Sequence, residues 1–222
     1  MSKVFGKNAI FLIFGALVFS AMSAHGQDLG SSSGIFRSPK TEAKSNSATR
    51  PHMELLSSRL NETVNLMIRV GTKVRFLETV EGTSTLRVGD RQGTVLPANK
   101  ASGGKAMLAE LEPALIEQLF RSQNAEIGGD SIPDAEYPAF LRELEAVRGN
   151  GFAANFEGTE EGISALGMAL HNGKGEVVGA ISVATPVTRF RAVFDAGLVA
   201  AMLETRRQLE IDIAANPAEA GP

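Results

Sequence analysis

The sequence has 222 residues, of which 43% are hydrophobic and 21% charged, a composition typical of a soluble globular protein with room for one domain and accessory segments. Its formal net charge of −3 argues against direct nucleic-acid binding by this chain alone, because such proteins usually carry a basic surplus. There is no cysteine, which excludes disulfides, thiolate chemistry and cysteine-based zinc sites. The three histidines (His25, His52 and His171) lack the spacing of a metal site, so we expect neither a metal nor another cofactor.

Residues 1–26 have the order of parts found in a secretory signal. Lys3 and Lys7 give a positive start, residues 9–19 are an unbroken apolar run, and small residues follow at 20–24. The apolar run is short for a membrane span, which needs about 20 residues. We therefore expect cleavage and export to the periplasm. The alternatives are an anchor in which residues 9–24 stay uncleaved, and a mis-assigned start or gene fusion in a cytoplasmic protein.

Residues 27–50 are serine-rich, polar and poor in large apolar side chains. Such a segment cannot bury enough surface to offset the entropy of ordering, so it predicts a flexible linker. We expect the folded domain to cover residues 51–213 and the last nine residues, 214–222, to form a disordered tail.

The first half of this domain predicts a helix opened by Pro51 and then a β-hairpin. Apolar residues alternate along residues 63–70, a turn follows at Gly71-Thr72, and residues 73–80 form the return strand. Shorter strands are expected at residues 86–88 and 94–96.

Helical patterns dominate the middle of the chain. Residues 102–111 predict a helix with Ser102 as N-cap, and Pro113 opens a second helix that runs to about Arg121. A glycine-rich loop is expected over residues 124–133. An amphipathic helix follows over residues 135–148, before a strand near Phe152.

A second hairpin is predicted near the C-terminus. Residues 163–170 and 176–184 are apolar runs on either side of Asn172-Gly173, a strong hairpin-turn signal. A single long helix is expected over residues 189–213. Because hairpins give antiparallel sheets, the fold class is α+β, an antiparallel sheet flanked by helices.

Several short segments, none specific alone, occur in an order that resembles the C-terminal domain of the IclR family of transcription regulators. They are Arg50-Pro51-His52 with Glu62 to Leu66, then Leu96-Pro97-Ala98 with Ala101 to Ala106, then Gly151-Phe152, then Glu161 to Ala165, and finally Gly179 to Val183 with Thr185-Pro186. The resemblance implies a curved, GAF-like or profilin-like sheet that binds a small organic acid and changes the contacts of a homo-oligomer. The family's DNA-binding winged helix-turn-helix normally precedes this domain. Here that space holds the signal-like segment and the linker, and the 24 linker residues 27–50 are too few for the compact core of a winged helix, so we expect the DNA-binding half to be missing.

The segment Ser102-Gly103-Gly104 is a candidate carboxylate site, because helix N-terminal amides bind anions and glycine lets a ligand approach the backbone. The alternative is that these glycines only allow tight packing. Gly104-Lys105 is not part of a phosphate loop, since Ala106 stands where that motif needs Ser or Thr. Ser182 lies within an apolar strand, where its hydroxyl must bond either a ligand or the backbone.

The resemblance also implies a set of pocket residues. They are Val88, Leu96, Ser102, Gly103, Asn155, Ile163, Ala165, Ser182 and Ala184. Relative to the family pattern, Asn155 replaces a frequent acid and Ala184 a second serine. Both changes remove polar character, which favours a larger or less polar ligand.

An enzyme is the main competing hypothesis. Ser182 and Ser164 are the best nucleophile candidates, but neither lies in a G-x-S-x-G elbow, and no histidine has an evident partner. We therefore expect a non-enzymatic effector-binding domain of an IclR-type regulator. The alternatives are an exported or anchored ligand-binding module, and a truncated or fused remnant of a regulator.

Overall fold

The computed structural model describes residues 39–215, with side chains from Thr49 onward. The helices are α1 (Pro39–Leu60), α2 (Ser102–Ala109), α3 (Pro113–Arg121), α4 (Gln123–Gly128), α5 (Tyr137–Asn150), α6 (Val187–Asp195) and α7 (Leu198–Ala215). The strands are β1 (Thr63–Val70), β2 (Lys73–Val80), β3 (Val95–Pro97), β4 (Ala153–Phe156), β5 (Ile163–His171) and β6 (Val177–Pro186). The predicted signal segment and the first part of the predicted linker lie outside the described residues.

All six strands form one antiparallel sheet in the order β3-β2-β1-β6-β5-β4. Both predicted hairpins are present, as β1 with β2 and β5 with β6. The two hairpins join through β1 and β6, which pair from Thr63 with Ala184 to Met67 with Ala180. The first and last strands of the domain are therefore neighbours at the centre of the sheet.

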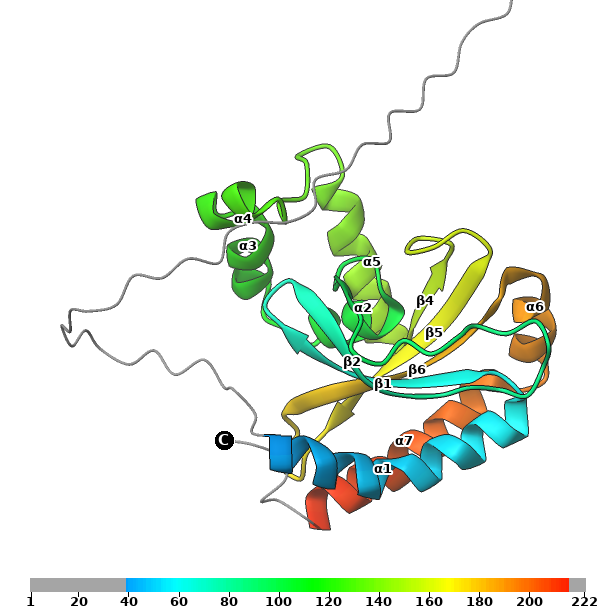
Figure 1. The fold of residues 1–222 in the computed structure, drawn as a ribbon. Helices are drawn as coiled ribbons and strands as arrows, with labels where there is room; N and C mark the ends of the chain where they lie inside the picture. The colour runs from blue at the N-terminus through cyan, green and yellow to red at the C-terminus, as the bar shows by residue number, and fades with distance from the viewer. Residues whose placement is uncertain (1–38, 216–222) are drawn as a thin grey trace, which may run out of the picture. The chain divides into compact units, whose positions relative to one another are not determined.

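Helices cover both faces of the curved sheet (Figure 1). On one face, α2, α3 and α5 form a hydrophobic cluster with Met67, Phe76 and Ala180. On the other face, α1, α6 and α7 pack on Val64, Leu166 and other residues of opposite parity. The predicted fold class, an α+β domain with an antiparallel sheet flanked by helices, is confirmed.

The central strand β1 is more buried than its sequence pattern predicts. Its first five residues are all buried, polar Thr63 and Asn65 included, whereas alternation predicts a half-buried strand. The reason is tertiary, because helices lie on both faces. Polar residues at this depth need partners, and Thr63 donates a 2.5 Å hydrogen bond to the Val88 carbonyl.

Helix α1 begins at Pro39, so residues 39–50 of the predicted linker are helical and Pro51 lies inside the helix rather than at its start. The polar composition of this segment does not favour a stable helix by itself, and contacts with the rest of the domain stabilise it. Thr49 is buried, and Arg50 Nη1 lies 2.9 Å from Glu78 Oε1. Helix α1 also packs along α7, whose end at Ala215 shortens the predicted tail.

Other local predictions were wrong. Residues 86–88 form no strand, although Val88 is buried. The glycine-rich segment 124–133 contains the short helix α4, whose N-cap Ser122 accepts a hydrogen bond from the Ala125 amide. In this helix a side-chain cap stabilises a turn that composition alone does not favour.

The predicted C-terminal helix is divided into α6 and α7. The break falls at Ala196-Gly197, where Gly197 has φ of 101°, a backbone conformation that a continuing helix cannot adopt. Arg189 of α6 donates hydrogen bonds of 2.7 and 2.9 Å to the buried Glu62 carboxylate, which fixes α6 against the start of β1. These bonds raise the pKa of Arg189 above its usual value.

Candidate functional site

Two rows of small and polar side chains cross the sheet beneath α2. In one row, Ser182 of β6 lies between Asn65 of β1 and Gly167 of β5. In the other row, Ala184 of β6 pairs with Ala165 of β5, which pairs in turn with Asn155 of β4. Residues two apart on a strand face the same side, so both rows face the layer that contains α2. Their small side chains leave room there that large apolar residues would fill.

The start of α2 lies directly on this face. A Cβ atom at Gly167 would come within 2.4 Å of the Gly103 nitrogen, and one at Gly104 would come within 2.2 Å of the Ala98 carbonyl oxygen. Glycine is therefore required at both positions for α2 to approach its neighbours. Ser102, at the first turn of α2, is held above the strands that carry Ser182 and Ala165.

A cavity lies between the start of α2, the two rows and the loops on either side. Its empty volume is about 360 Å³ when its mouth is included, but its interior is narrow. The lining residues are Asn65, Met67, Phe76, Arg91, Leu96, Ala101, Ser102, Asn155, Thr159, Ile163, Ala165, Ser182 and Ala184.

The structure brings together most of the residues predicted for the pocket. Those that line the cavity are Leu96, Ser102, Asn155, Ile163, Ala165, Ser182 and Ala184. Val88 and Gly103 do not line it. Val88 is buried beside Thr63, the β1 residue that pairs with Ala184, and its carbonyl accepts a hydrogen bond from the Thr63 hydroxyl. Gly103 packs against the sheet.

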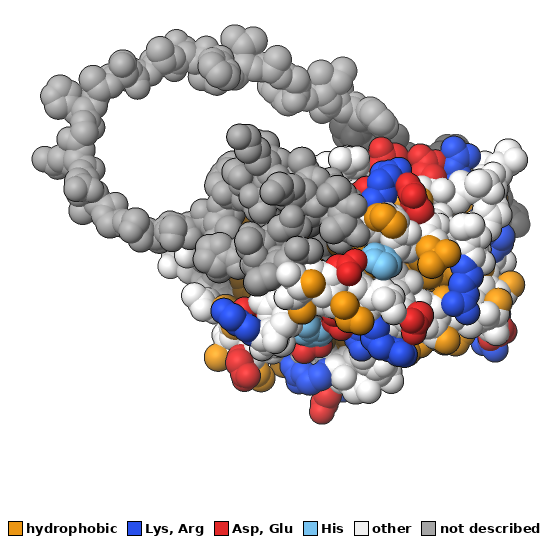
Figure 2. Space-filling view, turned by 90° about the horizontal axis from the view of Figure 1, so that it is seen from below, with side chains coloured by type: hydrophobic (Ala, Val, Ile, Leu, Met, Phe, Trp, Pro, Cys, Tyr) orange, Lys and Arg blue, Asp and Glu red, His pale blue; other side chains and the backbone are white. Residues whose placement is uncertain are grey.

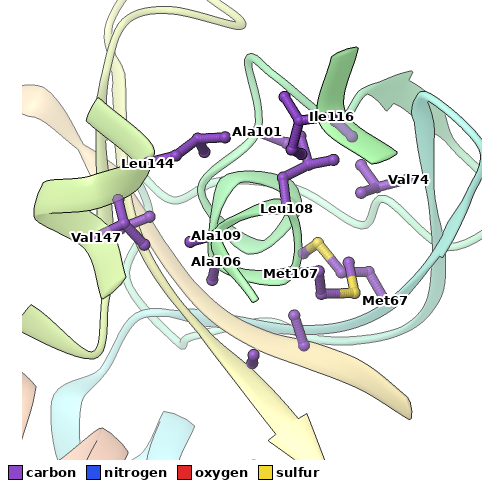
Figure 3. Close-up of a cluster of buried hydrophobic side chains, with 14 of the residues drawn as sticks. Met67, Val74, Ala101, Ala106, Met107, Leu108, Ala109, Ile116, Leu144 and Val147 are labelled. Atoms are coloured by element: carbon purple, nitrogen blue, oxygen red, sulfur yellow. The ribbon is translucent and has the colours of Figure 1, made fainter. Parts of the chain in front are cut away.

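The Gly103 position shows why the cavity is narrow. A Cβ there would meet Met67 Sδ at 2.4 Å and the Ala180 Cβ at 3.2 Å. The Met67 thioether thus fills the space beside Gly103, and Figure 3 shows it beside Met107 under α2. Methionine is unbranched and adopts several rotamers, so this space is occupied by an adaptable side chain.

Sequence reasoning missed six of the lining residues: Asn65, Met67, Phe76, Arg91, Ala101 and Thr159. Asn65 gave the clearest signal, an amide within an apolar strand. Its Nδ2 has no hydrogen-bond partner, although the residue is only 1% exposed. Arg91 gave none, because it lies in a loop that reaches the cavity only in the folded chain.

The cavity lining has one charged side chain. Arg91 is the charged residue of the lining, which contains no aspartate or glutamate. The predicted N-cap at Ser102 was wrong, because the helix begins there and Ala101 is the N-cap, without a side-chain hydrogen bond. The first-turn amides of α2 are thus not satisfied by a capping side chain, and a helix N-terminus attracts negative charge.

The nucleophile candidates lie apart from the histidines. Ser164 is fully buried and its parity places it on the opposite face of the sheet from Ala165. His171 Nδ1 is 2.8 Å from Glu210 Oε1. His52 Nε2 is 2.8 Å from Asp212 Oδ2, and neither histidine lines the cavity. Among residues 39–215 there is also no cluster of metal-binding side chains.

The outer surface of α1 and α7 carries a second hollow, lined by His52, Leu55, Leu56, Arg59, Ala201, Glu204, Thr205 and Gln208. Figure 2 views the molecule from this side, where apolar side chains are interspersed with charged ones. Leu55 is 71% exposed there. Within the described part of the chain, no helix has the length and apolar character of a membrane span.

Solved structures of transcriptional regulators contain the same fold. The transcriptional regulator YaiJ superposes with a TM-score of 0.69 at 24% identity, covering 78% of this chain and 97% of that one. The IclR protein of Thermotoga maritima superposes with a TM-score of 0.63 at 19% identity, covering 76% of this chain and 68% of that one. At these identities the likeness shows the fold.

Curated relatives match at the sequence level. The HTH-type transcriptional regulator KipR of Bacillus subtilis is 29% identical over 142 residues, 64% of this chain and 56% of KipR. The HTH-type transcriptional repressor AllR of Escherichia coli is 29% identical over 144 residues, 64% of this chain and 52% of AllR. This chain thus spans about half the length of the curated relatives that it matches.

The match to the family model is broader. The model of the bacterial transcriptional regulator IclR C-terminal domain covers residues 42–211, which include every strand and all the cavity-lining residues. The chain therefore belongs to the IclR family of bacterial transcriptional regulators, and residues 42–211 are its C-terminal domain.

Proposed function

We propose that this chain is a non-enzymatic effector-binding domain whose ligand is a small organic carboxylate. The ligand occupies the cavity between the start of α2 and the inner face of β6. The observation that carries the proposal is the cavity itself. Ser102, at the uncapped start of α2, and Ser182 both line it, and the lining contains one cation and no carboxylate. A carboxylate meets hydrogen-bond donors there and no carboxylate among the lining residues.

Ligand entry requires the cavity to widen. The interior is narrow, and Met67 fills the space beside Gly103, so a ligand has to move this side chain or shift α2 away from the sheet. Helix α2 also packs on α5, so a shift of α2 passes to the outer helices. We propose that this movement alters contacts in a homo-oligomer, and through them the activity of a regulator.

A thermal-shift experiment tests the site. Pyruvate and benzoate, a keto acid and an aromatic acid, are titrated against the wild type, Ser182→Leu and Ser164→Ala. A ligand at 100 times its Kd stabilises the native state by about 2.7 kcal/mol. We expect a concentration-dependent rise in Tm for the wild type and for Ser164→Ala, and none for Ser182→Leu. Equal shifts in all three proteins, or none in any, would overturn the proposal.

We propose a cytoplasmic location for this chain. The relatives are named as transcription regulators, and a regulator acts where the DNA is, which supports a cytoplasmic location over the predicted export. Mass spectrometry of the N-terminus of the purified protein tests this, because a chain that keeps residues 1–26 has not been processed as a secreted one. Reading the DNA upstream of the gene for a winged helix tests the predicted loss of the DNA-binding half.

A further inference from the structure

Three residues on one side of the cavity form a chain of hydrogen bonds. The Arg91 amide donates to Thr79 Oγ1 at 3.2 Å, and the Thr79 hydroxyl donates to Asn65 Oδ1 at 2.9 Å. The Thr79 hydroxyl accepts from Arg91, so its own proton is donated to Asn65. The Asn65 atom that it contacts must therefore be the acceptor oxygen Oδ1, and the amide nitrogen Nδ2 points away from Thr79. Asn65 is thereby held in one orientation.

The Nδ2 atom of Asn65 is the unusual feature of this arrangement. It is buried without a partner, in a residue that lines the cavity beside its cross-strand neighbour Ser182. Buried amide donors are almost always paired, so an unpaired one at a cavity wall indicates an acceptor that is absent from the protein itself.

The Arg91 side chain supplies a second set of donors on the same side. It lines the cavity and is only 16% exposed, while its partner Glu160 is 54% exposed. One Arg91 nitrogen, Nη2, bonds Glu160 Oε2 at 2.5 Å. A guanidinium has five N–H donors, so others remain for a group inside the cavity.

These donors and the start of α2 belong to different elements of the cavity wall. Helix α2 rests on Gly167 of β5, and Asn65 lies two strands away on β1. At about 4.8 Å between strands, the Cα atoms of Asn65 and Gly167 are roughly 10 Å apart. A ligand that reaches both sets of donors therefore needs two acceptor groups joined by a short backbone.

We propose that Asn65 and Arg91 bind a second carboxylate, so that the ligand is a short dicarboxylate. This inference rests on the proposed function, which places the first carboxylate at the α2 N-terminus. Arg91 makes a charge-assisted bond to the second carboxylate, and Asn65 donates to it or to a neighbouring oxygen. Arg91 and Asn65 thus determine specificity for length and charge.

Matched acids and matched variants test the inference by isothermal titration calorimetry on the full chain. The acids are succinate and glutarate against butyrate and valerate, which have the same numbers of carbons but one carboxylate. The variants are Arg91→Gln and the control Arg87→Gln. Arg87 lies in the same loop and pairs with Glu81 but does not line the cavity.

We expect the wild type and Arg87→Gln to bind the dicarboxylates at least tenfold more tightly than the monocarboxylates. Arg91→Gln should lose this preference and bind the two kinds of acid alike. Equal affinities in the wild type, or an undiminished preference in Arg91→Gln, would overturn the inference and leave the proposed function standing. If none of the four acids binds the wild type, this inference fails, and the pyruvate and benzoate titration then decides separately whether the proposed function fails as well.

Discussion

Gly167 of β5 lies so close to Gly103 of α2 that a Cβ on Gly167 would be 2.4 Å from the Gly103 nitrogen. The contact is with backbone, which cannot rotate away as a side chain does. The distance between α2 and the sheet, and with it the depth of the cavity, is therefore set by the absence of a side chain at position 167.

Substitution of Gly167 by alanine should separate α2 from the sheet. We expect a loss of about 3 kcal/mol in the free energy of unfolding, at the upper end of what overpacking costs. Urea denaturation followed by circular dichroism measures it. Gly149→Ala in α5 is the control, since a Cβ there meets no atom within 4 Å and alanine favours a helix, so we expect no loss of stability. Similar losses in both variants would contradict the close approach.

Met67→Ala should enlarge the cavity. Removing this buried side chain is expected to lower the free energy of unfolding by roughly 2–5 kcal/mol, and also to open the space beside Gly103. Benzoate should then raise the Tm of Met67→Ala more than that of the wild type. Met107→Ala is the control, because Met107 belongs to the same hydrophobic cluster but does not line the cavity. If benzoate raised the Tm of Met107→Ala by as much as that of Met67→Ala, the effect would not depend on enlarging this cavity.

Ser164→Ala should stabilise the protein. The Ser164 hydroxyl is buried without a hydrogen-bond partner, and removing such a group relieves a desolvation cost of about 1 kcal/mol. In a domain of this size we expect a rise in Tm of roughly 2–4 °C by differential scanning calorimetry. A fall in Tm would mean that the hydroxyl has a partner, such as a buried water.

Asp130 should make part of the stability depend on pH. The Lys73 ammonium, followed by the Thr72 hydroxyl, lowers the pKa of Asp130 below its usual 3.8 by hydrogen bonding. A lowered pKa in the folded state gives stability that is present above pH 3.8 and is lost as the pH falls through the folded-state pKa.

The measurement is the difference in free energy of unfolding between the wild type and Asp130→Asn as a function of pH. We expect roughly 0.5–1 kcal/mol at pH 6, the scale of a partly exposed ion pair, and a difference that shrinks toward zero below pH 3.8. A difference that stays constant down to pH 2 would show that the carboxylate charge is not responsible.

Sequence patterns alone predicted the two hairpins, the helices α2, α3 and α5, and the family. These features depend on local signals, namely alternation along β1 and β2, Asn172-Gly173 at the second turn and Pro113 at the start of α3. Most of the predicted pocket residues also line one cavity, because the parity of β5 and β6 fixes which side chains share a face.

Three features could not be predicted from local sequence patterns: the extension of α1 back to Pro39, the boundary between α6 and α7, and the loop that reaches the cavity. Arg91 is the clearest example. Its amide is linked to Asn65 by hydrogen bonds through Thr79, and no local sequence pattern predicts that these distant residues meet. The start of α1 and the break at Gly197 depend likewise on contacts with the rest of the domain and on one backbone angle. The spacing of apolar residues along a strand or helix predicts which side chains share a face of that element. Contacts between segments distant in sequence depend on how the whole chain packs.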